Sequence, residues 1–412
     1  MLLSLKNIGR FYSEAKIEIN GITIIAGENG TGKSTIGKAL YCVFNSLHEI
    51  KNKVYLSRIN SVRIRLGIVS GASGREKMSM YYLIAKNIID NYERDHEKLK
   101  ILLVNNGYLL DSLTEQEINS LLSDIMKIAE TDEDEIVRHI VENEFSNKFA
   151  GQLQHVNHTD EPGVIDVSIR ESHILIEDHY EAELSVKEYL PLVKDIIYFD
   201  DEYSLENNIS LYNRNLMYHD SLQDKIILGK KEKLDIVGDI LSEERYKRII
   251  DRMNSAHIGE LIREKNRDFE YKEFGLSKSI RVENMSSGVK IMVLLKHIML
   301  NGYLEDNGII ILDEPEIHLH PEWQKMLAEI IVIMQVEFNM NVLISTHSSD
   351  FLAFIQYYTR KYLINENNKV YLIKKNNDFT SNVCDVTTNI DEVYRVLGEP
   401  FIEVSGELKY ES

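Results

Sequence analysis

The sequence predicts an α/β fold with a parallel or mixed core sheet, an antiparallel β-subdomain near the N-terminus and a mainly helical insertion. Strand patterns fill residues 1–26, and helical periodicity dominates from about residue 84 to 160. From about residue 282 to 374 strands and helices alternate, which is typical of a parallel α/β sheet. The 412 residues are enough for two to three domains or one elaborated domain.

The composition is that of a folded, soluble protein. Hydrophobic residues make up 43% of the chain and charged residues 27%, which excludes a disordered or collagen-like chain. Aliphatic runs such as 309–312 are short, whereas a membrane helix needs about 20 apolar residues. The N-terminus lacks a secretory signal, and the two cysteines, Cys42 and Cys384, cannot form a disulfide framework. We therefore expect a cytoplasmic protein without a membrane segment.

The net charge is negative and unevenly distributed. With 47 basic and 66 acidic residues the chain carries −19, which argues against coating nucleic acid by bulk electrostatics. Residues 1–83 nevertheless hold 12 Lys or Arg and only 5 Glu. One stretch without acidic residues contains Lys51, Lys53, Arg58, Arg63, Arg65 and Arg75. This stretch is either a basic patch for phosphates or an acidic partner, or a solvated surface that balances the acidic remainder.

The N-terminal segment is predicted to form three strands and then a helix. Residues 3–8 and 15–19 alternate apolar with polar side chains, as half-buried strands do. Residues 21–26 are more uniformly apolar and predict a fully buried strand. We expect a helix to begin at Lys33.

The middle of the chain is predicted to be a helical insertion. Thr114 and Glu117 form a capping box ahead of an apolar helical face. After an acidic run at 130–135, the turn at 161–163 precedes alternating residues that predict a β-hairpin near 164–177. These patterns assign residues 1–83 and 267–412 to the main domain and residues 84–266 to the insertion.

A phosphate-binding loop follows the third predicted strand. Its sequence fits Gly, four variable residues and Gly-Lys-Ser, and it opens the predicted helix. The glycines let backbone N–H groups approach phosphate oxygens, and the helix N-terminus adds positive charge. Lys33 is expected to neutralise the β- and γ-phosphates of ATP, and the Ser34 hydroxyl to bind Mg²⁺. The predicted nucleotide-binding residues are Gly27, Glu28, Asn29, Gly30, Thr31, Gly32, Lys33, Ser34 and Thr35.

A buried aliphatic strand ends in two adjacent carboxylates. The run 308–312 is followed by Asp313 and Glu314. In phosphoryl transfer such a pair can hold Mg²⁺ and orient the attacking water. We therefore predict Asp313 as a Mg²⁺ ligand and Glu314 as the catalytic carboxylate of an ATPase.

Two further segments resemble motifs of ABC-type ATPases. Ser286, Ser287 and Gly288 precede an apolar helix and resemble the signature turn, which in that family binds the γ-phosphate held by the opposite subunit. Ser287 stands where the family has Gly, and Val289 where Gln or Glu is common; an ordinary Ser N-cap is the alternative reading. His347 follows the apolar strand 341–345 and resembles the family's switch histidine, which implies a γ-phosphate contact.

The order of these motifs resembles that of ABC-type ATPases, and their details resemble the OLD-like branch of the AAA family. These details are Asp313-Glu314-Pro315-Glu316-Ile317-His318-Leu319-His320-Pro321 and Ser345-Thr346-His347-Ser348. The branch includes ATPases of bacterial anti-phage systems such as Septu and PARIS, and RecF and SMC-type ATPases are more distant. The resemblance covers residues 1–48 and 268–375 and implies an ABC-type P-loop NTPase head.

The resemblance implies a slow ATPase that forms an ATP-sandwich homodimer or a higher homo-oligomer. Each site is expected to combine Lys33, Ser34, Asp313, Glu314 and His347 of one chain with residues 286–288 of the other. Too few residues follow Ser349 for the nuclease domain of OLD enzymes, so the effector is expected to be a separate protein such as an HNH nuclease. DNA or a phage product is a candidate trigger. A RecF- or SMC-like repair ATPase and a nearly non-hydrolysing scaffold are the alternatives.

Three secondary assignments remain open from sequence alone. His320 occupies the stretch that contacts the other subunit in the family, and is a candidate for that role. Glu316, His318 and His320 could alternatively bind a metal, because alternating residues of an extended segment can face one way, although a fourth ligand is lacking. Gln152 and Gln154 are candidates for the family's glutamine loop or ordinary surface residues.

Overall fold

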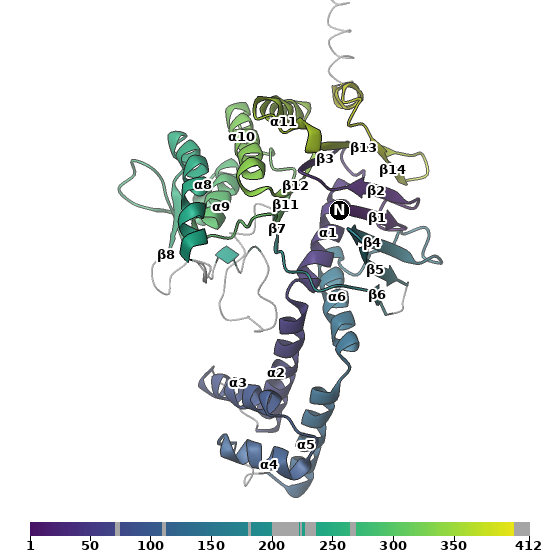
Figure 1. Ribbon diagram of the computed structural model, residues 1–412, viewed down its shortest axis with the longest axis vertical. Coiled ribbons are helices and arrows are strands. Elements are labelled where there is room, and N and C mark those ends of the chain that lie inside the picture. The colour runs from purple at the N-terminus through teal and green to yellow at the C-terminus, as the bar shows by residue number, and fades with distance from the viewer. Residues whose placement is uncertain are drawn as a thin grey trace, which may run out of the picture. The chain divides into compact units, whose positions relative to one another are not determined.

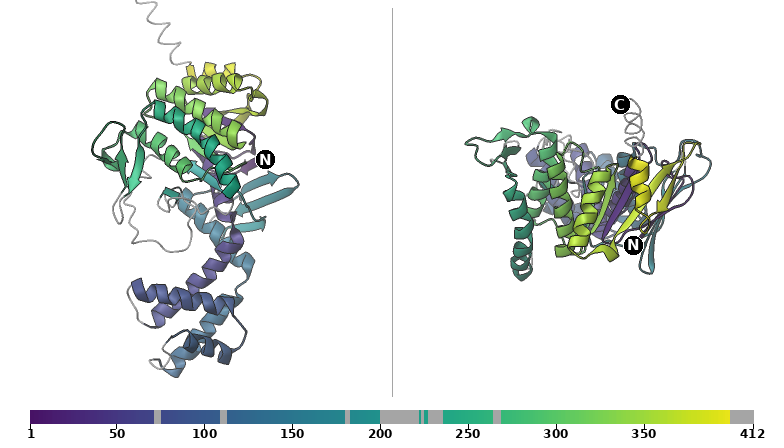
Figure 2. Two further views of the ribbon diagram at one scale, coloured as in Figure 1. Left: turned by 60° about the vertical axis from the view of Figure 1, so that its left-hand side comes forward. Right: turned by 90° about the horizontal axis from the view of Figure 1, so that it is seen from above.

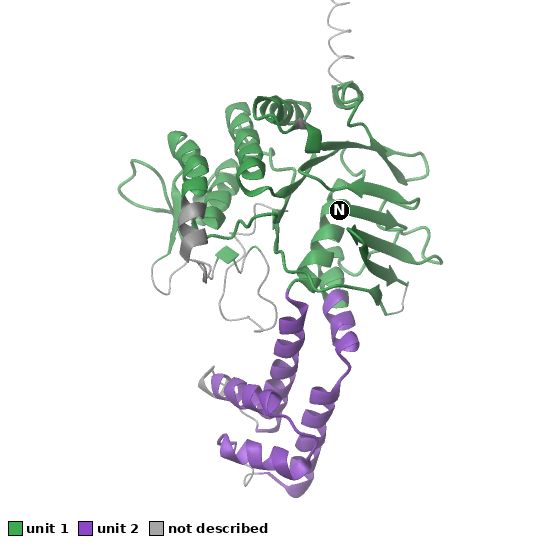
Figure 3. Ribbon diagram, viewed as in Figure 1, with its two compact units in different colours: residues 1–48, 142–211, 220–412 green, residues 49–141, 212–219 purple. Residues whose placement is uncertain are grey.

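The computed structural model describes residues 1–70, 75–108, 113–179, 183–199, 222, 225–226, 236–263 and 269–398. The chain divides into two compact units (Figure 3). We call residues 1–48, 142–211 and 220–412 the sheet unit, and residues 49–141 and 212–219 the helical unit. Within the described ranges, no helix combines the length and the apolar character needed to cross a membrane.

An antiparallel sheet of five strands forms the first layer of the sheet unit (Figure 1). Its order is β2 (Ala15–Glu18), β1 (Leu2–Lys6), β4 (Gly163–Ile169), β5 (Ser172–Asp178) and β6 (Ser185–Glu188). The alternation of exposed and buried residues in β1, β2 and β4 matches a sheet with one covered face. The predicted N-terminal strands and the hairpin near 164–177 are therefore confirmed.

The core sheet has six strands and carries the loops of the site. Its order is β14 (Ser381–Asp385), β13 (Lys369–Lys375), β3 (Ile22–Gly27), β12 (Asn341–Thr346), β11 (Ile309–Asp313) and β7 (Ile196–Phe199). All neighbours pair in parallel except β14, which is antiparallel to β13. Because parallel strands end at one edge, the residues that follow β3, β11 and β12 meet there.

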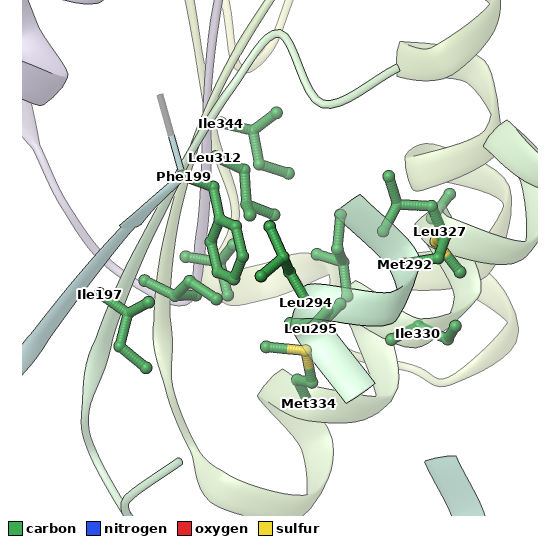
Figure 4. Packing of buried hydrophobic residues seen from close by; sticks show 14 of the residues in the cluster. Ile197, Phe199, Met292, Leu294, Leu295, Leu312, Leu327, Ile330, Met334 and Ile344 are labelled. Atoms are coloured by element: carbon green, nitrogen blue, oxygen red, sulfur yellow. The ribbon is translucent and has the colours of Figure 1, made fainter. Parts of the chain in front are cut away.

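Helices cover both faces of the core sheet. α1 (Lys33–Leu47) packs on one face, where Gly37 allows a close approach to Ile311 and Tyr198. On the other face, Ile197 and Phe199 of β7, with Leu312 and Ile344, point toward α9 (Ser287–Leu300) and α10 (Pro321–Phe338), as Figure 4 shows. α8 (Ile236–Ser255), α9, α10 and α11 (Ser349–Lys361) form a packed series (Figure 2). The sheet is thus buried on both sides, which explains its apolar strands.

A small antiparallel sheet lies ahead of α9. It has the order β10 (Ile280–Arg281), β9 (Phe269–Lys272) and β8 (Glu260–Arg263), and η4 (Val282–Asn284) leads from it to α9. A second 3₁₀ turn, η5 (Asn365–Asn367), precedes β13. The sequence pattern of residues 269–282 also predicts strands, and β9 and β10 confirm them at 269–272 and 280–281.

The helical unit has its own hydrophobic core. It contains α2 (Ile50–Val69), α3 (Arg75–Asp90), α4 (His96–Asn105) and α5 (Glu115–Glu130), and α6 (Glu133–Phe149) begins in it. Buried residues from α2 to α5, such as Leu66, Ile88 and Leu121, form one cluster. The predicted capping box of Thr114 and Glu117 is present at the start of α5.

The predicted basic stretch lies largely in helix α2, and most of its cationic side chains are buried or bonded to other residues of the helical unit. Lys53 and Arg63 of α2 are buried, and Arg63 donates to Asn60. Arg58 donates to the carbonyl of Thr131 at 2.8 Å, and Arg65 pairs with Asp124. The side chain of Arg75 lies outside the described residues. Of the two interpretations that the sequence left open, the structure does not support a free basic patch formed by Lys53, Arg58, Arg63 and Arg65; Lys51 is exposed.

The boundaries of the units differ from the predicted insertion at residues 84–266. The helical unit begins at Glu49, and the hairpin of β4 and β5 belongs to the sheet unit because β4 pairs with β1, for example Val167 with Leu3. β7 likewise joins the core sheet beside β11. These pairings connect strands that are far apart in the sequence, so local patterns could not reveal them. Residues 231–263 have a helical sequence pattern. α8 confirms this over Ile236–Ser255, but Glu260–Arg263 form β8, and 231–235 lies outside the described residues.

Candidate functional site

The phosphate loop joins β3 to α1. Gly32 has a φ of 100°, and a Cβ there would lie 3.2 Å from Arg10 Cβ and from the Phe11 ring, so only glycine fits. α1 has no side-chain cap and no acidic residue in its first turn. Glu28, Asn29 and Gly30 are exposed, and Ser34 and Thr35 in that first turn are partly exposed. The helix N-terminus therefore offers uncapped N–H groups for an anion.

The side chain of Lys33 bonds to the backbone of this loop. Its Nζ donates to the carbonyl of Gly27 at 2.9 Å and to that of Glu28 at 3.0 Å, and its side chain is only 3% exposed. The Thr31 hydroxyl donates to the Glu28 carbonyl at 2.9 Å. These bonds hold a buried positive charge at the loop, where it can meet phosphate oxygens.

Glu314 pairs with that charge. Its Oε1 lies 3.1 Å from Lys33 Nζ, and the carboxylate side chain is 21% exposed. Glu314 has a φ of 48°, a left-handed conformation that is unfavourable for a residue with a Cβ. Its N–H donates to the Ser345 carbonyl at 3.0 Å, which fixes the strained backbone to the neighbouring strand.

Asp313 ends β11 with both oxygens oriented by donors. Tyr198 on β7 lies with its hydroxyl 3.2 Å from Oδ2, and the hydroxyl of Ser345 on β12 donates to Oδ1. The two strands that flank β11 thus hold this carboxylate at the sheet edge.

His347 lies next to Glu314 at the end of β12. Its Nδ1 is 3.2 Å from Glu314 Oε2, although the two are not aligned for a hydrogen bond. The imidazole is 38% exposed, so it is accessible to a ligand. Lys33 and His347 therefore flank one carboxylate, one on each oxygen.

The buried carboxyl group of Glu316 accepts a hydrogen bond from Thr346, the residue before His347. The Thr346 hydroxyl donates to Glu316 Oε1 and accepts a bond of 3.0 Å from the Ser348 N–H. Glu316 is 3% exposed, its Oε2 has no hydrogen-bond partner among the described residues, and burial raises the pKa of its carboxyl group. The Glu316–Thr346 bond thus ties the segment after β11 to the end of β12.

The signature-like turn opens α9. Ser286 is exposed at the N-cap position, so the alternative reading as an N-cap is confirmed for its position, although its side chain makes no capping hydrogen bond. Ser287 is partly exposed, and a Cβ on Gly288 would lie 2.5 Å from the His318 carbonyl. Val289 packs against the main core. The turn therefore leaves two serines at the surface and requires glycine at 288.

The metal alternative at residues 316–320 is not supported by the structure. Glu316 binds Thr346, and His320 accepts the Glu322 N–H at 3.4 Å as the N-cap of α10. His318 is exposed with a φ of 63°. In the described part of the chain, no three His, Cys, Asp or Glu side chains converge as a metal site would require.

Gln154, a candidate for the glutamine loop, makes its hydrogen bonds to the backbone of other segments. Its Nε2 donates to the carbonyls of Glu161 at 3.2 Å and Asp178 at 2.6 Å. Gln152 is exposed and lies beside it on the same loop. Neither side chain has a described hydrogen bond to Lys33, Asp313 or Glu314.

The residues present fit a nucleotide and Mg²⁺. The buried ammonium of Lys33 and the uncapped N–H groups of α1 are donors for phosphate oxygens. The Ser34 hydroxyl and the Asp313 carboxylate are hard oxygen ligands, which Mg²⁺ prefers. Sequence reasoning missed Tyr198, whose strand 196–199 it placed in the insertion, although four consecutive strand-forming residues were a signal.

Comparison with solved structures finds SMC heads and the ATP-binding cassette of an ABC transporter. The structure of an SMC head bound to the C-terminal winged-helix domain of ScpA has a TM-score of 0.47 at 14% identity, covering 95% of this chain and 98% of that one. The SMC head of Thermotoga maritima has a TM-score of 0.37 at 11% identity, covering 93% and 98%. An ATP-binding cassette of an ABC transporter in its ADP conformation has a TM-score of 0.34 at 10% identity, covering 98% and 98%.

The family comparison covers most of the chain. Residues 2–352 match the model of the AAA ATPase domain, a range that includes the phosphate loop, the carboxylates at 313–314 and His347. The mixed core sheet, the phosphate loop and its following helix form an α/β P-loop ATPase fold. The chain therefore belongs to the AAA ATPase domain family.

Proposed function

We propose that this protein is a slow, Mg²⁺-dependent ATP phosphohydrolase that controls a separate effector in bacterial anti-phage defence. The observation that carries the enzymatic part is the position of Glu314 between Lys33 and His347. The resemblance of its motifs to OLD-like defence ATPases supports the biological part.

In this proposal each residue of the sheet edge has one task. Lys33 and the α1 N–H groups hold the β- and γ-phosphates, and Ser34 and Asp313 hold Mg²⁺. The bound Mg²⁺ neutralises charge that develops on the phosphate oxygens. Glu314 orients the attacking water and accepts its proton, while His347 contacts the γ-phosphate. Ser286, Ser287 and Gly288 of a second copy complete the site, so hydrolysis requires a homodimer.

The helical unit is proposed as the docking surface for the effector. Its residues 49–141 hold 13 Lys or Arg and 15 Asp or Glu, so this part of the unit is nearly neutral. It instead exposes large apolar side chains, namely Ile64, Ile68, Met80, Leu83, Ile101 and Val104. In the proposal these side chains together form the surface that the effector covers, since a contiguous exposed apolar patch is typical of a protein contact.

The proposal is tested by phage challenge together with a biochemical assay. Cells carrying the wild-type gene and its neighbour are expected to resist phage, and Lys33→Ala or Glu314→Gln cells to lose resistance. For the docking surface, Ile68→Glu/Leu83→Glu protein is expected to hydrolyse ATP normally but to lose the co-purifying neighbour. Ile262→Glu, an exposed apolar position in the sheet unit, is the matched control. Full retention of the partner by the double variant contradicts the docking assignment. If the Lys33→Ala and Glu314→Gln cells keep their phage resistance but become sensitive to DNA damage, the RecF-like alternative is favoured.

A further inference from the structure

Glu316 is a buried acid near the site that has no task in the proposed hydrolysis. It is 3% exposed, and its Oε2 has no hydrogen-bond partner among the described residues. Its Oε1 accepts a hydrogen bond from the hydroxyl of Thr346, which is fully buried. Burying a carboxyl group with one oxygen unpartnered is unfavourable, and an apolar side chain of similar size fills such a position at lower cost. Stability alone therefore does not account for an acid at position 316.

The main chain of Glu316 is anchored independently of this carboxyl group. Its carbonyl accepts the Leu319 N–H at 3.1 Å and the side-chain amide of Gln324 at 3.3 Å. Gln324 belongs to α10, whose buried residues lie in the main core. The carboxyl group is thus not needed to shape its own segment, and its described contact is with Thr346.

Thr346 forms a turn around His347. Its hydroxyl oxygen accepts the Ser348 N–H at 3.0 Å, so this bond spans the histidine. The Ser348 hydroxyl in turn caps α11 by accepting the Phe351 N–H at 3.1 Å. A hydroxyl has a single hydrogen, and because Thr346 donates it to Glu316, its lone pairs remain available to the Ser348 N–H. Glu316 therefore fixes the hydroxyl orientation on which the turn depends.

The turn determines where the imidazole of His347 lies. Nδ1 is 3.2 Å from Glu314 Oε2 without an aligned hydrogen bond, and the imidazole is 38% exposed. The position of the ring thus depends on the backbone of residues 346–348. A displacement of about 1 Å at a catalytic site can cost about 100-fold in rate, so a contact with the γ-phosphate requires this backbone to be fixed.

We infer that Glu316 is a positioning residue of the proposed ATP hydrolysis, which acts through Thr346 to hold His347 at the γ-phosphate. The inference rests on the proposed function, because the phosphate contact of His347 is part of that proposal. Loss of the carboxyl group slows the chemical step. ATP binding, which in the proposal depends on Lys33 and the α1 N–H groups, is retained.

The test is a double-mutant cycle on the full chain with Mg²⁺ and ATP. Glu316→Met is expected to lower turnover at saturating ATP at least about tenfold, whereas the affinity for a fluorescent ATP analogue changes less than about twofold. Glu316→Gln keeps an oxygen acceptor for Thr346 and is expected to regain most of the turnover. In the His347→Ala background, Glu316→Met is expected to lower turnover less than about twofold, because the group that it positions is already absent. Equal losses in both backgrounds overturn the inference.

Glu329→Met is the matched control for the loss of a buried acid. Glu329 is 8% exposed, lies on α10 and pairs with Arg252 and Lys361 outside the site. At a temperature at which circular dichroism shows every variant to be folded, Glu329→Met is expected to leave turnover unchanged. A loss equal to that of Glu316→Met indicates a general effect of destabilisation and overturns the inference.

Chemical modification of His347 gives a measurement that does not use hydrolysis. Diethyl pyrocarbonate modifies accessible imidazoles of the nucleotide-free chain, and mass spectrometry gives the rates at His347 and at His173, which is exposed. In Glu316→Met the rate at His347 is expected to rise at least about threefold, because the turn opens more often, and the rate at His173 to stay unchanged. An unchanged rate at His347 overturns the inference, whereas a wild-type chain without ATP turnover contradicts the proposed function even if this rate rises.

Thr346→Val removes the same hydrogen bond from its other end and keeps the test valid if Glu316→Met does not fold. It is expected to lower turnover and to raise the modification rate of His347 as Glu316→Met does. Thr346→Ser keeps the hydroxyl and is expected to regain most of the turnover. Wild-type turnover together with a wild-type modification rate in the valine variant overturns the inference.

Discussion

The Nζ atom of Lys33 lies 3.1 Å from Oε1 of Glu314, so the ammonium of the phosphate loop and the carboxylate after β11 neutralise one another. The pair is well shielded, since the Lys33 side chain is 3% exposed and that of Glu314 21%. A phosphate that binds at the loop competes with Glu314 for the same ammonium. In the proposed function, binding therefore releases the carboxylate that is needed for hydrolysis.

Glu314→Gln is expected to bind ATP at least as tightly as the wild type but to hydrolyse it at least about 100-fold more slowly. The amide keeps the shape of the side chain, no longer competes for Lys33 as an anion, and cannot accept the proton of water. Titration with a fluorescent ATP analogue measures the affinity, and phosphate release measures turnover. Unchanged turnover would remove the catalytic role of Glu314.

Lys33→Ala is expected to lose most ATP affinity, because it removes the buried charge that meets the phosphates. Lys38→Ala, on the same helix but outside the phosphate loop, is the matched control and is expected to bind normally. The same titration compares the two variants. Equal affinities would show that the loop binds nucleotide without its lysine.

Complementation between two inactive variants tests the composite site. Ser287→Arg is expected to bind ATP but not hydrolyse it, because arginine blocks the partly exposed turn before Gly288. Mixed with Lys33→Ala protein it is expected to recover part of the turnover, since one chain supplies the loop and the other the turn. Phosphate release over a range of mixing ratios measures the recovery, and none at any ratio indicates self-contained monomers.

Thr346→Val is expected to lower the free energy of unfolding by about 1–3 kcal/mol, because buried Glu316 loses its hydroxyl donor. Thr346→Ser keeps the hydroxyl and is expected to retain most of the stability. Denaturant unfolding of both variants gives the comparison. A valine variant as stable as the serine variant would mean that the bond contributes nothing.

Glu316→Gln is expected to change the pH dependence of stability. Burial raises the folded-state pKa of Glu316, so the folded chain binds a proton that the unfolded chain releases above its ordinary pKa near 4.5. The wild type therefore loses stability as pH rises from this value through the folded pKa, and the variant lacks this loss. Unfolding midpoints at pH 4 to 8 are expected to show the variant gaining on the wild type as pH increases; a constant difference contradicts the shift.

Sequence reasoning predicted the local parts of the fold and site. The phosphate loop, the strand that ends at Asp313 and the capping box at Thr114 each depend on consecutive residues, and all lie where they were predicted. The pairing of β4 with β1 and of Tyr198 with Asp313 depends on contacts across more than a hundred residues. Such contacts have no local pattern in the sequence.

The charges illustrate the same limit. The run of cations from Lys51 to Arg65 left a basic patch and a solvated surface as alternatives, because whether a cation is available depends on partners elsewhere, such as Thr131 and Asp124. The Lys33–Glu314 pair likewise joins residues that sequence analysis assigned to separate steps.

Because the backbone of Glu314 is left-handed, a change at this position that increases the folding stability would decrease the proposed ATP turnover. Glycine there would relieve about 1–2 kcal/mol of strain but would remove the carboxylate. In a lineage that uses ATP only as a structural ligand, drift toward glycine or asparagine at this position is therefore favoured. On the proposed catalytic role of Glu314, selection for hydrolysis would retain glutamate against that drift, and this residue would then distinguish hydrolysing ATPases from non-hydrolysing scaffolds among related chains.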